Sequence, residues 1–195
     1  MADEDAAAKR RARQTLINLL LSLSATIAVV AAVILAVPRS DENIVPPVDY
    51  KAVAKMVTSN TERPLLVPKL EPMGEGWWCN SARYTTKTKD GVDNWYAGFV
   101  GPKGQYIGLT QAFNSNTTWD GLFLNAPNPA GHLTINGLPF EVLQAAEPSD
   151  PPKSKDFALL NHAGADSIFV YGTASRAELE KFAKLVVDQI NEVYP

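Results

Sequence analysis

The sequence has little of the side-chain chemistry that catalytic and metal sites usually need. It contains one cysteine, so no intramolecular disulfide can form, and only two histidines. These residues fall short of a zinc site built from Cys and His alone, and no C-x-x-C-H is present to attach a haem. The net charge of −3 argues against nucleic acid as a partner, because nucleic-acid binding needs a concentrated basic face. We therefore expect no metal and no cofactor.

A long apolar run near the amino terminus is the strongest signal that is present. Residues 15–37 contain no charged side chain, and thirteen of these 23 positions are Leu, Ile or Val. As a helix the run would be roughly 34 Å long, slightly more than the ~30 Å hydrocarbon core of a bilayer. The alternative is a cleaved signal peptide, whose apolar stretch is only about 7–15 residues long. The sequence therefore predicts an uncleaved transmembrane helix over 15–37.

The charges that flank this run indicate its orientation. Four basic residues precede it: Lys9, Arg10, Arg11 and Arg13. Only Arg39 follows it closely. Because Lys and Arg are retained on the cytoplasmic side, residues 1–14 should form a cytoplasmic tail. The sequence thus predicts a single-pass protein of the cell membrane, with its N-terminus cytoplasmic and its C-terminal domain extracytoplasmic.

Small side chains recur every four residues along the predicted span, at Ser24, Ala28, Ala32 and Ala36. Such a stripe lets the backbone of another helix approach closely, so it is a candidate surface for partner-helix packing. Alanine is also common in membrane spans, and the stripe can arise without a partner. Both interpretations stay open, with other transmembrane subunits as the expected partners beside the lipid bilayer.

The composition changes twice after the predicted span. Residues 38–48 are polar and rich in proline, which suits an extended spacer. Residues 49–58 have apolar side chains at helical spacing, which predicts a short amphipathic helix. We assign 38–63 to a linker that includes this helix, and 64–195 to a folded extracytoplasmic domain.

The predicted domain is mostly strands and turns. Strands are expected at 78–86, 92–100, 105–113, 133–135, 138–143, 157–160 and 167–171. Asn136-Gly137 is the clearest turn signal, because this dipeptide suits a two-residue primed turn between antiparallel strands. A short helix is expected at 117–125, capped by Thr118 or Asp120. The strands are mostly connected as hairpins, so the sequence predicts an antiparallel sheet.

The chain ends with its most strongly patterned helix. Ser175 and Glu178 have the spacing of a capping box, in which each side chain binds a backbone N–H of the other residue. One apolar stripe follows: Leu179, Phe182, Ala183, Val186, Ile190 and Val193. Such a stripe must be buried, and one face of the sheet is the nearest candidate. The predicted fold class is α+β, with one N-terminal transmembrane helix, an extracytoplasmic antiparallel sheet of hairpins and a packed C-terminal helix.

Few side chains are candidates for chemistry. Cys79 is interpreted as a small buried hydrophobe, because cysteine is among the most buried residue types. His132 and His162 lie at the ends of predicted strands, and neither has a nucleophile or an orienting partner at a recognisable spacing. We therefore expect no catalytic residue, no cofactor-binding residue and no metal ligand, and we expect that the protein is not an enzyme.

All four tryptophans lie in the predicted outer domain. Trp77 and Trp78 are adjacent, so on a strand their side chains would point to opposite faces and one of them would be less buried. A partly exposed tryptophan is a frequent interface anchor, although filling a core is the commoner role. Trp77 and Trp78 are therefore the candidate interface aromatics.

Several short motifs are shared with one family. They are the V-P-x-L-E-P-x-G-E-G-W-W pattern over Val67–Trp78, Asn80–Arg83, Trp95–Phe99, Tyr106-Ile107 with Gln111, Gly137 before Phe140, and Tyr171–Ala174. Together they cover nearly the whole chain, which resembles an actinobacterial family of unknown function, DUF4245. The resemblance implies export and anchoring in an actinobacterial envelope, and it supplies no catalytic residues. At the level of fold alone, the sheet with its terminal helix is also similar to Mog1/PsbP-type domains.

The resemblance and the predicted anchor suggest a function. Small actinobacterial proteins with one anchor and an outer domain occur as accessory subunits of the respiratory bcc–aa3 supercomplex. We expect a non-catalytic accessory or structural subunit of a membrane complex, with this respiratory supercomplex as the candidate. One alternative is a cell-envelope module that binds a lipid or small apolar ligand between sheet and helix. Another is a hydrolase that uses Cys79 or His162.

Overall fold

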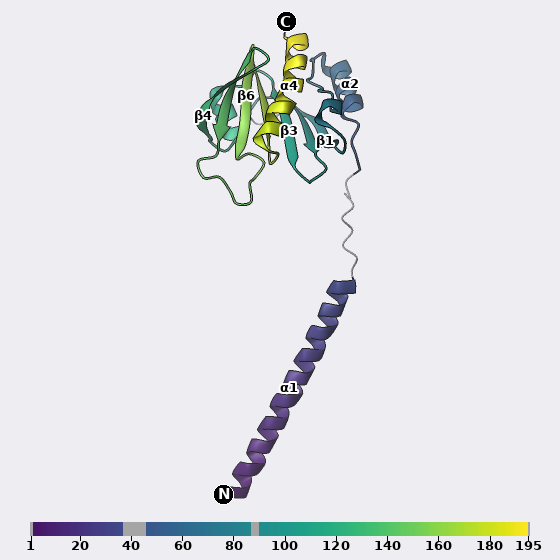
Figure 1. Ribbon diagram of the computed structural model, residues 1–195, viewed down its shortest axis with the longest axis vertical. Coiled ribbons are helices and arrows are strands. Elements are labelled where there is room, and N and C mark those ends of the chain that lie inside the picture. Colours follow the sequence, from purple (N-terminus) through teal and green to yellow (C-terminus); the bar gives the residue numbers. More distant parts are fainter. Residues whose placement is uncertain (1, 37–45, 87–89, 195) are drawn as a thin grey trace. The chain divides into compact units, whose positions relative to one another are not determined.

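The structure is a computed structural model that describes residues 2–36, 46–86 and 90–194 (Figure 1). Its contacts divide the chain into two compact units, Met1–Ile44 and Val45–Pro195. The first unit contains the helix α1 (Ala2–Ala36), and the second contains every other element.

The helix α1 is continuous through the basic tail and most of the predicted span. Its stretch Arg13–Leu35 is long and apolar enough to cross a membrane. Large apolar side chains are exposed along it, among them Leu19, Ile27 and Leu35. Lipid would cover these side chains, and a helix satisfies its own backbone hydrogen bonds, as a membrane span requires. The expected last residue of the span, Val37, and the spacer residues 38–45 lie outside the described residues.

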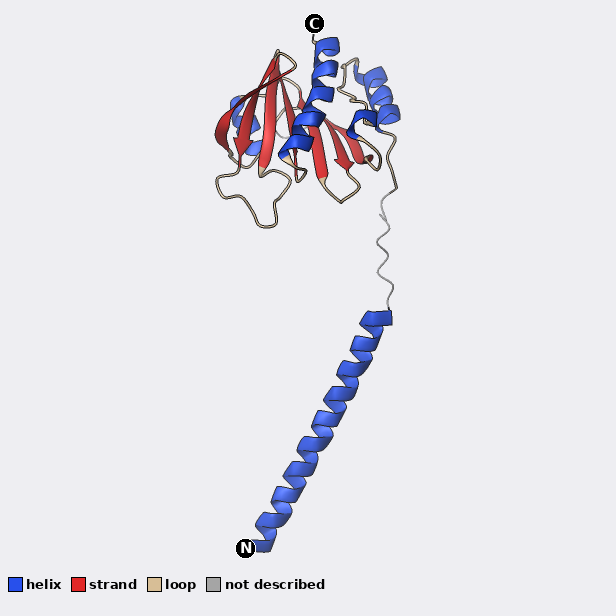
Figure 2. Cartoon of the chain, viewed as in Figure 1, coloured by secondary structure: helices blue, strands red, loops and turns tan. Residues whose placement is uncertain are grey.

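The second unit is built on a seven-stranded antiparallel sheet (Figure 2). The strands are β1 (Trp78–Thr85), β2 (Asn94–Val100), β3 (Tyr106–Ala112), β4 (Asn128–Ile135), β5 (Leu138–Gln144), β6 (Phe157–Ala163) and β7 (Asp166–Gly172). Their order is β1-β2-β3-β7-β6-β5-β4, so two meanders join where β3 pairs with β7. The predicted α+β fold is confirmed, although β4 begins five residues earlier than the sequence predicts.

The turn between β4 and β5 explains why this hairpin can be predicted from the sequence. Ile135 pairs with Leu138, and the two residues between them have positive φ angles, 46° at Asn136 and 88° at Gly137. A type I′ turn requires this left-handed pair, and Asn and Gly are the residues that adopt it at least cost.

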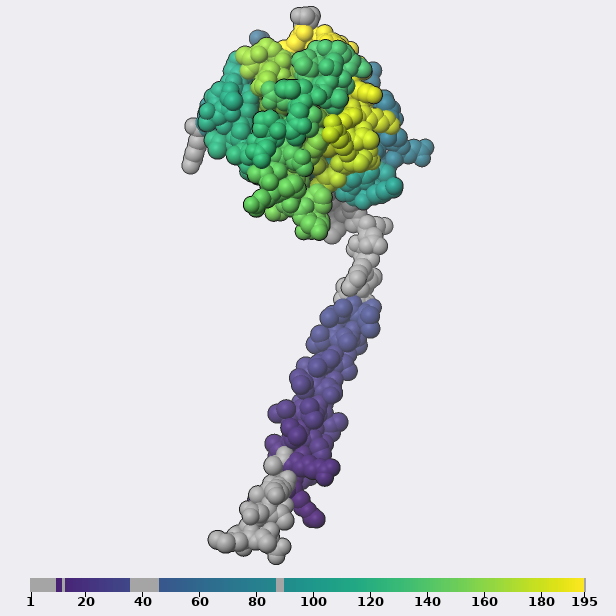
Figure 3. Space-filling view, turned by 60° about the vertical axis from the view of Figure 1, so that its left-hand side comes forward, coloured from purple at the N-terminus to yellow at the C-terminus, as the bar shows by residue number. Residues whose placement is uncertain are grey.

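One face of the sheet is covered by α4 (Arg176–Val193), as Figure 1 shows. Both hydrogen bonds of the predicted capping box, between Ser175 and Glu178, are present. The ring of Phe182 lies 5.2 Å from that of Phe99 on β2, and both side chains are fully buried in the main core. Each such ring contributes about 1.5–3 kcal/mol through burial. The other side of α4 stays in solvent and forms the yellow band in Figure 3.

The amphipathic helix α2 (Tyr50–Thr61) and the single-turn helix η1 (Glu71–Met73) complete this face. The ring of Tyr50 meets that of Phe99 edge-on at 5.2 Å, and its hydroxyl donates to the carbonyl of Pro68. The helix is therefore part of the compact unit Val45–Pro195, whereas the sequence predicts a linker that extends to residue 63. The helical spacing of apolar residues identifies the apolar side of α2, but it does not identify the surface against which this side packs.

The opposite face carries α3 (Thr117–Phe123) and a smaller core (Figure 2). The ring of Phe123 lies 4.9 Å from that of Phe169 on β7. The helix is capped by Asn116, whose side chain accepts from the backbone N–H of Trp119. The expected cap, Thr118 or Asp120, was therefore wrong, because Asp120 turns toward the sheet and is 5% exposed.

Candidate functional site

The small-residue stripe lies along one side of α1. Residues four apart in a helix share a face, and the described side chains of Ser24, Ala28 and Ala32 are all exposed. Ala36 is the last residue of the helix. The stripe from 24 to 36 extends over roughly 18 Å at 1.5 Å per residue, which is long enough for a helix–helix contact. The topology-setting residues Lys9, Arg10, Arg11 and Arg13 lie on the same helix, N-terminal to the stripe.

Trp77 and Trp78 are half-buried and line a groove of about 590 Å³, which we call the aromatic groove. Its other walls come from Pro47, Tyr50 and Lys51 near the start of α2, and from Leu70, Glu71 and residues 74–76 around η1. Trp77 lies against the backbone of Gly101, where an added Cβ would be 2.9 Å from the indole. The glycine therefore allows the indole to approach the turn after β2 closely. The structure thus places both predicted interface aromatics in one open concavity.

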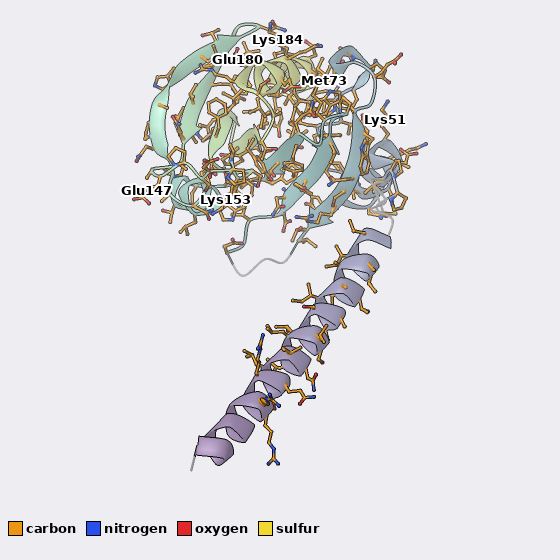
Figure 4. The ribbon with its side chains drawn as sticks, turned by 60° about the horizontal axis from the view of Figure 1, so that its bottom comes forward. Lys51, Met73, Glu147, Lys153, Glu180 and Lys184 are labelled. Atoms are coloured by element: carbon orange, nitrogen blue, oxygen red, sulfur yellow. The ribbon has the colours of Figure 1, made fainter. Side chains whose placement is uncertain are left out.

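The rim of the aromatic groove is charged. Lys51, whose position is labelled in Figure 4, lies with its Nζ 3.4 Å from Oε1 of Glu71. Both side chains are exposed, so this pair adds little to stability. The pKa of Glu71 lies below its usual value, first because a backbone N–H binds the carboxylate and then because Lys51 is near.

Cys79 also lines the aromatic groove and is 3% exposed, in agreement with the prediction that it is buried. Its Sγ donates to the carbonyl of Ser81, and burial raises the pKa of the thiol to about 11. A thiol with this pKa is protonated at neutral pH and is a poor nucleophile. Cys79 is therefore a structural residue.

The other two tryptophans have different surroundings. Trp95 is fully buried, and its Nε1 donates to the carbonyl of Leu66. Trp119 is half-buried on α3, stacks on Phe123 at 5.1 Å and adjoins Leu122, which is 73% exposed. The sequence does not single out this second aromatic patch, because α3 has only seven residues and therefore a weak helical periodicity.

A polar chain of Asp120, Ser167 and His162 is visible only in the folded protein. Ser167 donates its hydroxyl hydrogen to Oδ2 of Asp120 at 2.8 Å, and its Oγ lies 3.0 Å from Nδ1 of His162. His162 and Ser167 face each other across the β6–β7 pair, whereas Asp120 comes from α3. A catalytic triad places the imidazole between hydroxyl and carboxylate. Here the hydroxyl is in the middle and Ser167 is 1% exposed, so this chain does not activate a nucleophile.

A family model described as "Protein of unknown function (DUF4245)" matches residues 11–186. The chain belongs to the DUF4245 family. The match extends from α1 through all seven strands into α4. Neither the comparison with curated proteins nor that with solved structures gives a match. The similarity to Mog1/PsbP-type domains and the actinobacterial origin therefore stay predictions.

In this DUF4245 protein, two residues of the motifs that carry the resemblance have structural roles. Gln111 is fully buried: its Oε1 accepts from the N–H of Leu66, and its Nε2 donates to the Pro64 carbonyl and to the Tyr194 hydroxyl. Gly172 is needed for close packing, because a Cβ there would lie 1.9 Å from the carbonyl oxygen of Tyr106. These positions fix the fold and do not identify a site.

Proposed function

We propose that this DUF4245 protein is a non-catalytic, single-pass accessory subunit of a larger membrane complex. Its N-terminus is cytoplasmic and its outer domain is extracytoplasmic, as the basic residues before the span predict. The complex to test first is the actinobacterial respiratory cytochrome bcc–aa3 supercomplex. The observation that carries the proposal is α1, an exposed apolar helix with small residues along one side.

The arrangement of side chains on α1 supports a partner helix. Contact with lipid needs only apolar side chains, whereas a close helix–helix contact needs small ones at the crossing. The bulkier residues Val30 and Ile34 lie on the side away from Ala28 and Ala32, given 100° per residue. One side of α1 therefore suits lipid, and the other suits a neighbouring subunit.

The aromatic groove gives the outer domain a second contact surface. Half-buried tryptophans are typical binding hot spots, because they bury a large area with few rotatable bonds. The groove combines the apolar Trp77 and Trp78 with the charged rim of Lys51 and Glu71. An apolar centre with a polar rim is the usual composition of a protein interface.

A mild-detergent pull-down from native membranes tests the proposal. The tagged full-length protein is compared with the double variant Ala28→Leu/Ala32→Leu and with Val30→Leu, which adds bulk on the lipid-facing side. We expect a stoichiometric membrane partner with the wild type and with Val30→Leu, and its loss with the double variant. Haem absorbance and mass spectrometry of the captured material would identify a bcc–aa3 partner. No stoichiometric partner, or equal capture by the double variant, would refute the accessory role.

The alternative ligand site between sheet and helix is filled by the protein itself. Phe99, Ile107 and Phe182 are fully buried where α4 meets the sheet. A lipid or small apolar ligand would therefore have to bind elsewhere on the domain.

A further inference from the structure

A cavity of about 460 Å³ lies between α3 and the strands β5 and β6, on the face of the sheet opposite α4. We call it the α3 cavity. Leu143 and Leu160, both nearly buried, provide part of its apolar lining. Small-ligand sites commonly enclose about 300–1,000 Å³ and combine an apolar lining with a few placed polar groups. The α3 cavity has this size and composition.

Asp120 gives the α3 cavity one carboxylate oxygen without a hydrogen-bond partner among the described residues. The side chain is 5% exposed, and its Oδ2 accepts from Ser167. Its other oxygen, Oδ1, is buried and has no hydrogen-bond partner among the described residues. A buried carboxylate oxygen without a donor is unfavourable, and native proteins rarely keep one without a reason. The missing donor can come from a ligand in the cavity that Asp120 lines.

A second carboxylate, that of Glu141, also lines the α3 cavity. Its titratable residues are Asp120, Glu141 and His162, and no Lys or Arg of the described part of the chain lines it. Because Ser167 gives its hydroxyl hydrogen to Asp120, His162 must donate to Ser167 from Nδ1. The cavity therefore offers two carboxylates, which suit a ligand that is both a donor and a cation.

We propose that the α3 cavity binds an organic cation, namely a primary ammonium on a small apolar body. The ammonium donates to Oδ1 of Asp120, Glu141 adds a second negative charge, and Leu143 and Leu160 contact the apolar part. A metal ion fits less well, because the described residues contain no group of three His, Cys, Asp or Glu that could hold one. The inference does not depend on the accessory role, since the aromatic groove and the α3 cavity share no lining residue.

Ligand-observed NMR on the full-length protein in detergent tests this assignment. The probes are phenethylammonium, its neutral analogue 2-phenylethanol and the anion phenylacetate. We expect phenethylammonium to bind with a dissociation constant on the order of 1 mM, as its few heavy atoms allow. The two other probes should bind at least tenfold more weakly. No binding of phenethylammonium, equal binding of the neutral probe, or displacement of the ammonium by Ca²⁺ or Zn²⁺ would overturn the proposal.

Substitutions locate the binding in the α3 cavity. Asp120→Asn keeps an acceptor for Ser167 but removes the charge, and it should weaken phenethylammonium binding about 10- to 100-fold, as expected for a charged hydrogen bond. Glu141→Gln, at a half-buried position, should weaken it several-fold and serves if Asp120→Asn does not fold. The control Asp188→Asn, exposed on α4, should leave it unchanged. Unchanged binding in the folded variants at 120 and 141 would contradict the proposal.

Discussion

Replacing Gln111 by leucine should destabilise the outer domain strongly, although no catalytic or binding role is involved. Gln111 is fully buried on β3 and connects three distant parts of the chain. Its hydrogen bonds to the Leu66 N–H at 3.0 Å, to the Pro64 carbonyl at 3.2 Å and to the Tyr194 hydroxyl at 2.7 Å would all be lost. Leucine fills a similar volume but offers no polar atom.

The size of the effect depends on which partners keep another hydrogen bond. Tyr194 still donates to Asp166, and water can reach the exposed residue Pro64. Leu66 is fully buried, so its N–H would lose its partner out of reach of water. One unsatisfied buried donor costs about 1–3 kcal/mol, and with the two lesser losses we expect about 2–4 kcal/mol. For a domain of this size the melting temperature should fall by about 5–15 °C.

Urea unfolding of the detergent-solubilised protein measures this loss through tryptophan fluorescence. All four tryptophans lie in the outer domain, and Trp95 donates to the Leu66 carbonyl, next to the broken contact. The control is Gln144→Leu, exposed at the end of β5, which should change the stability by no more than about 0.5 kcal/mol. A loss of less than about 1 kcal/mol for Gln111→Leu, or a loss equal to that of the control, would refute the structural role of Gln111.

Three further predictions concern the outer domain. Ser175→Ala removes half of the capping box of α4 and should lower the free energy of unfolding by about 0.5–2 kcal/mol in urea titrations; an unchanged midpoint would contradict this. The buried thiol of Cys79 should react with iodoacetamide at pH 7.5 only when urea unfolds the domain, so rapid labelling of the native protein would show that the thiol is accessible. Burial raises the pKa of Cys79 to about 11 and that of Tyr171 to about 12. Because the unfolded chain loses these protons at lower pH, the free energy of unfolding should be retained below pH 9 and fall between about pH 9 and 12. Urea midpoints measured at pH 8 and 10.5 would check this.

The parts of the fold that depend on local sequence could be predicted from the residues. The capping box at Ser175 and the primed turn at Asn136-Gly137 each involve residues within three positions of each other, so their signals are present in the chain itself. The pairing of β3 with β7 brings Leu109 next to Val170 across 61 positions, and no local pattern encodes it. This β3–β7 pairing follows from how the two meanders pack together.

The candidate sites also combine features that the local sequence predicts with features that depend on the fold. Trp77 and Trp78 could be singled out because two adjacent large aromatic residues are conspicuous in a sequence, although their groove depends on α2 and η1. Asp120 and Ser167 are 47 positions apart and meet only because α3 packs on β7. From the sequence Asp120 is a candidate helix cap, which is the common use of Asp at that location. The fold instead buries it in the wall of the α3 cavity.

Labelling of single introduced cysteines in intact cells tests the central claim most directly. Cys79 is buried and should not react with the label. Each of two variants therefore adds one reactive thiol: Ala165→Cys in the exposed turn between β6 and β7, and Ala6→Cys in the basic tail. A membrane-impermeant maleimide should label Ala165→Cys in intact cells and Ala6→Cys only after lysis, with both proteins recovered in the membrane fraction. Labelling of Ala165→Cys only after lysis, or recovery of the intact chain in the soluble fraction, would contradict an anchored protein with an extracytoplasmic domain.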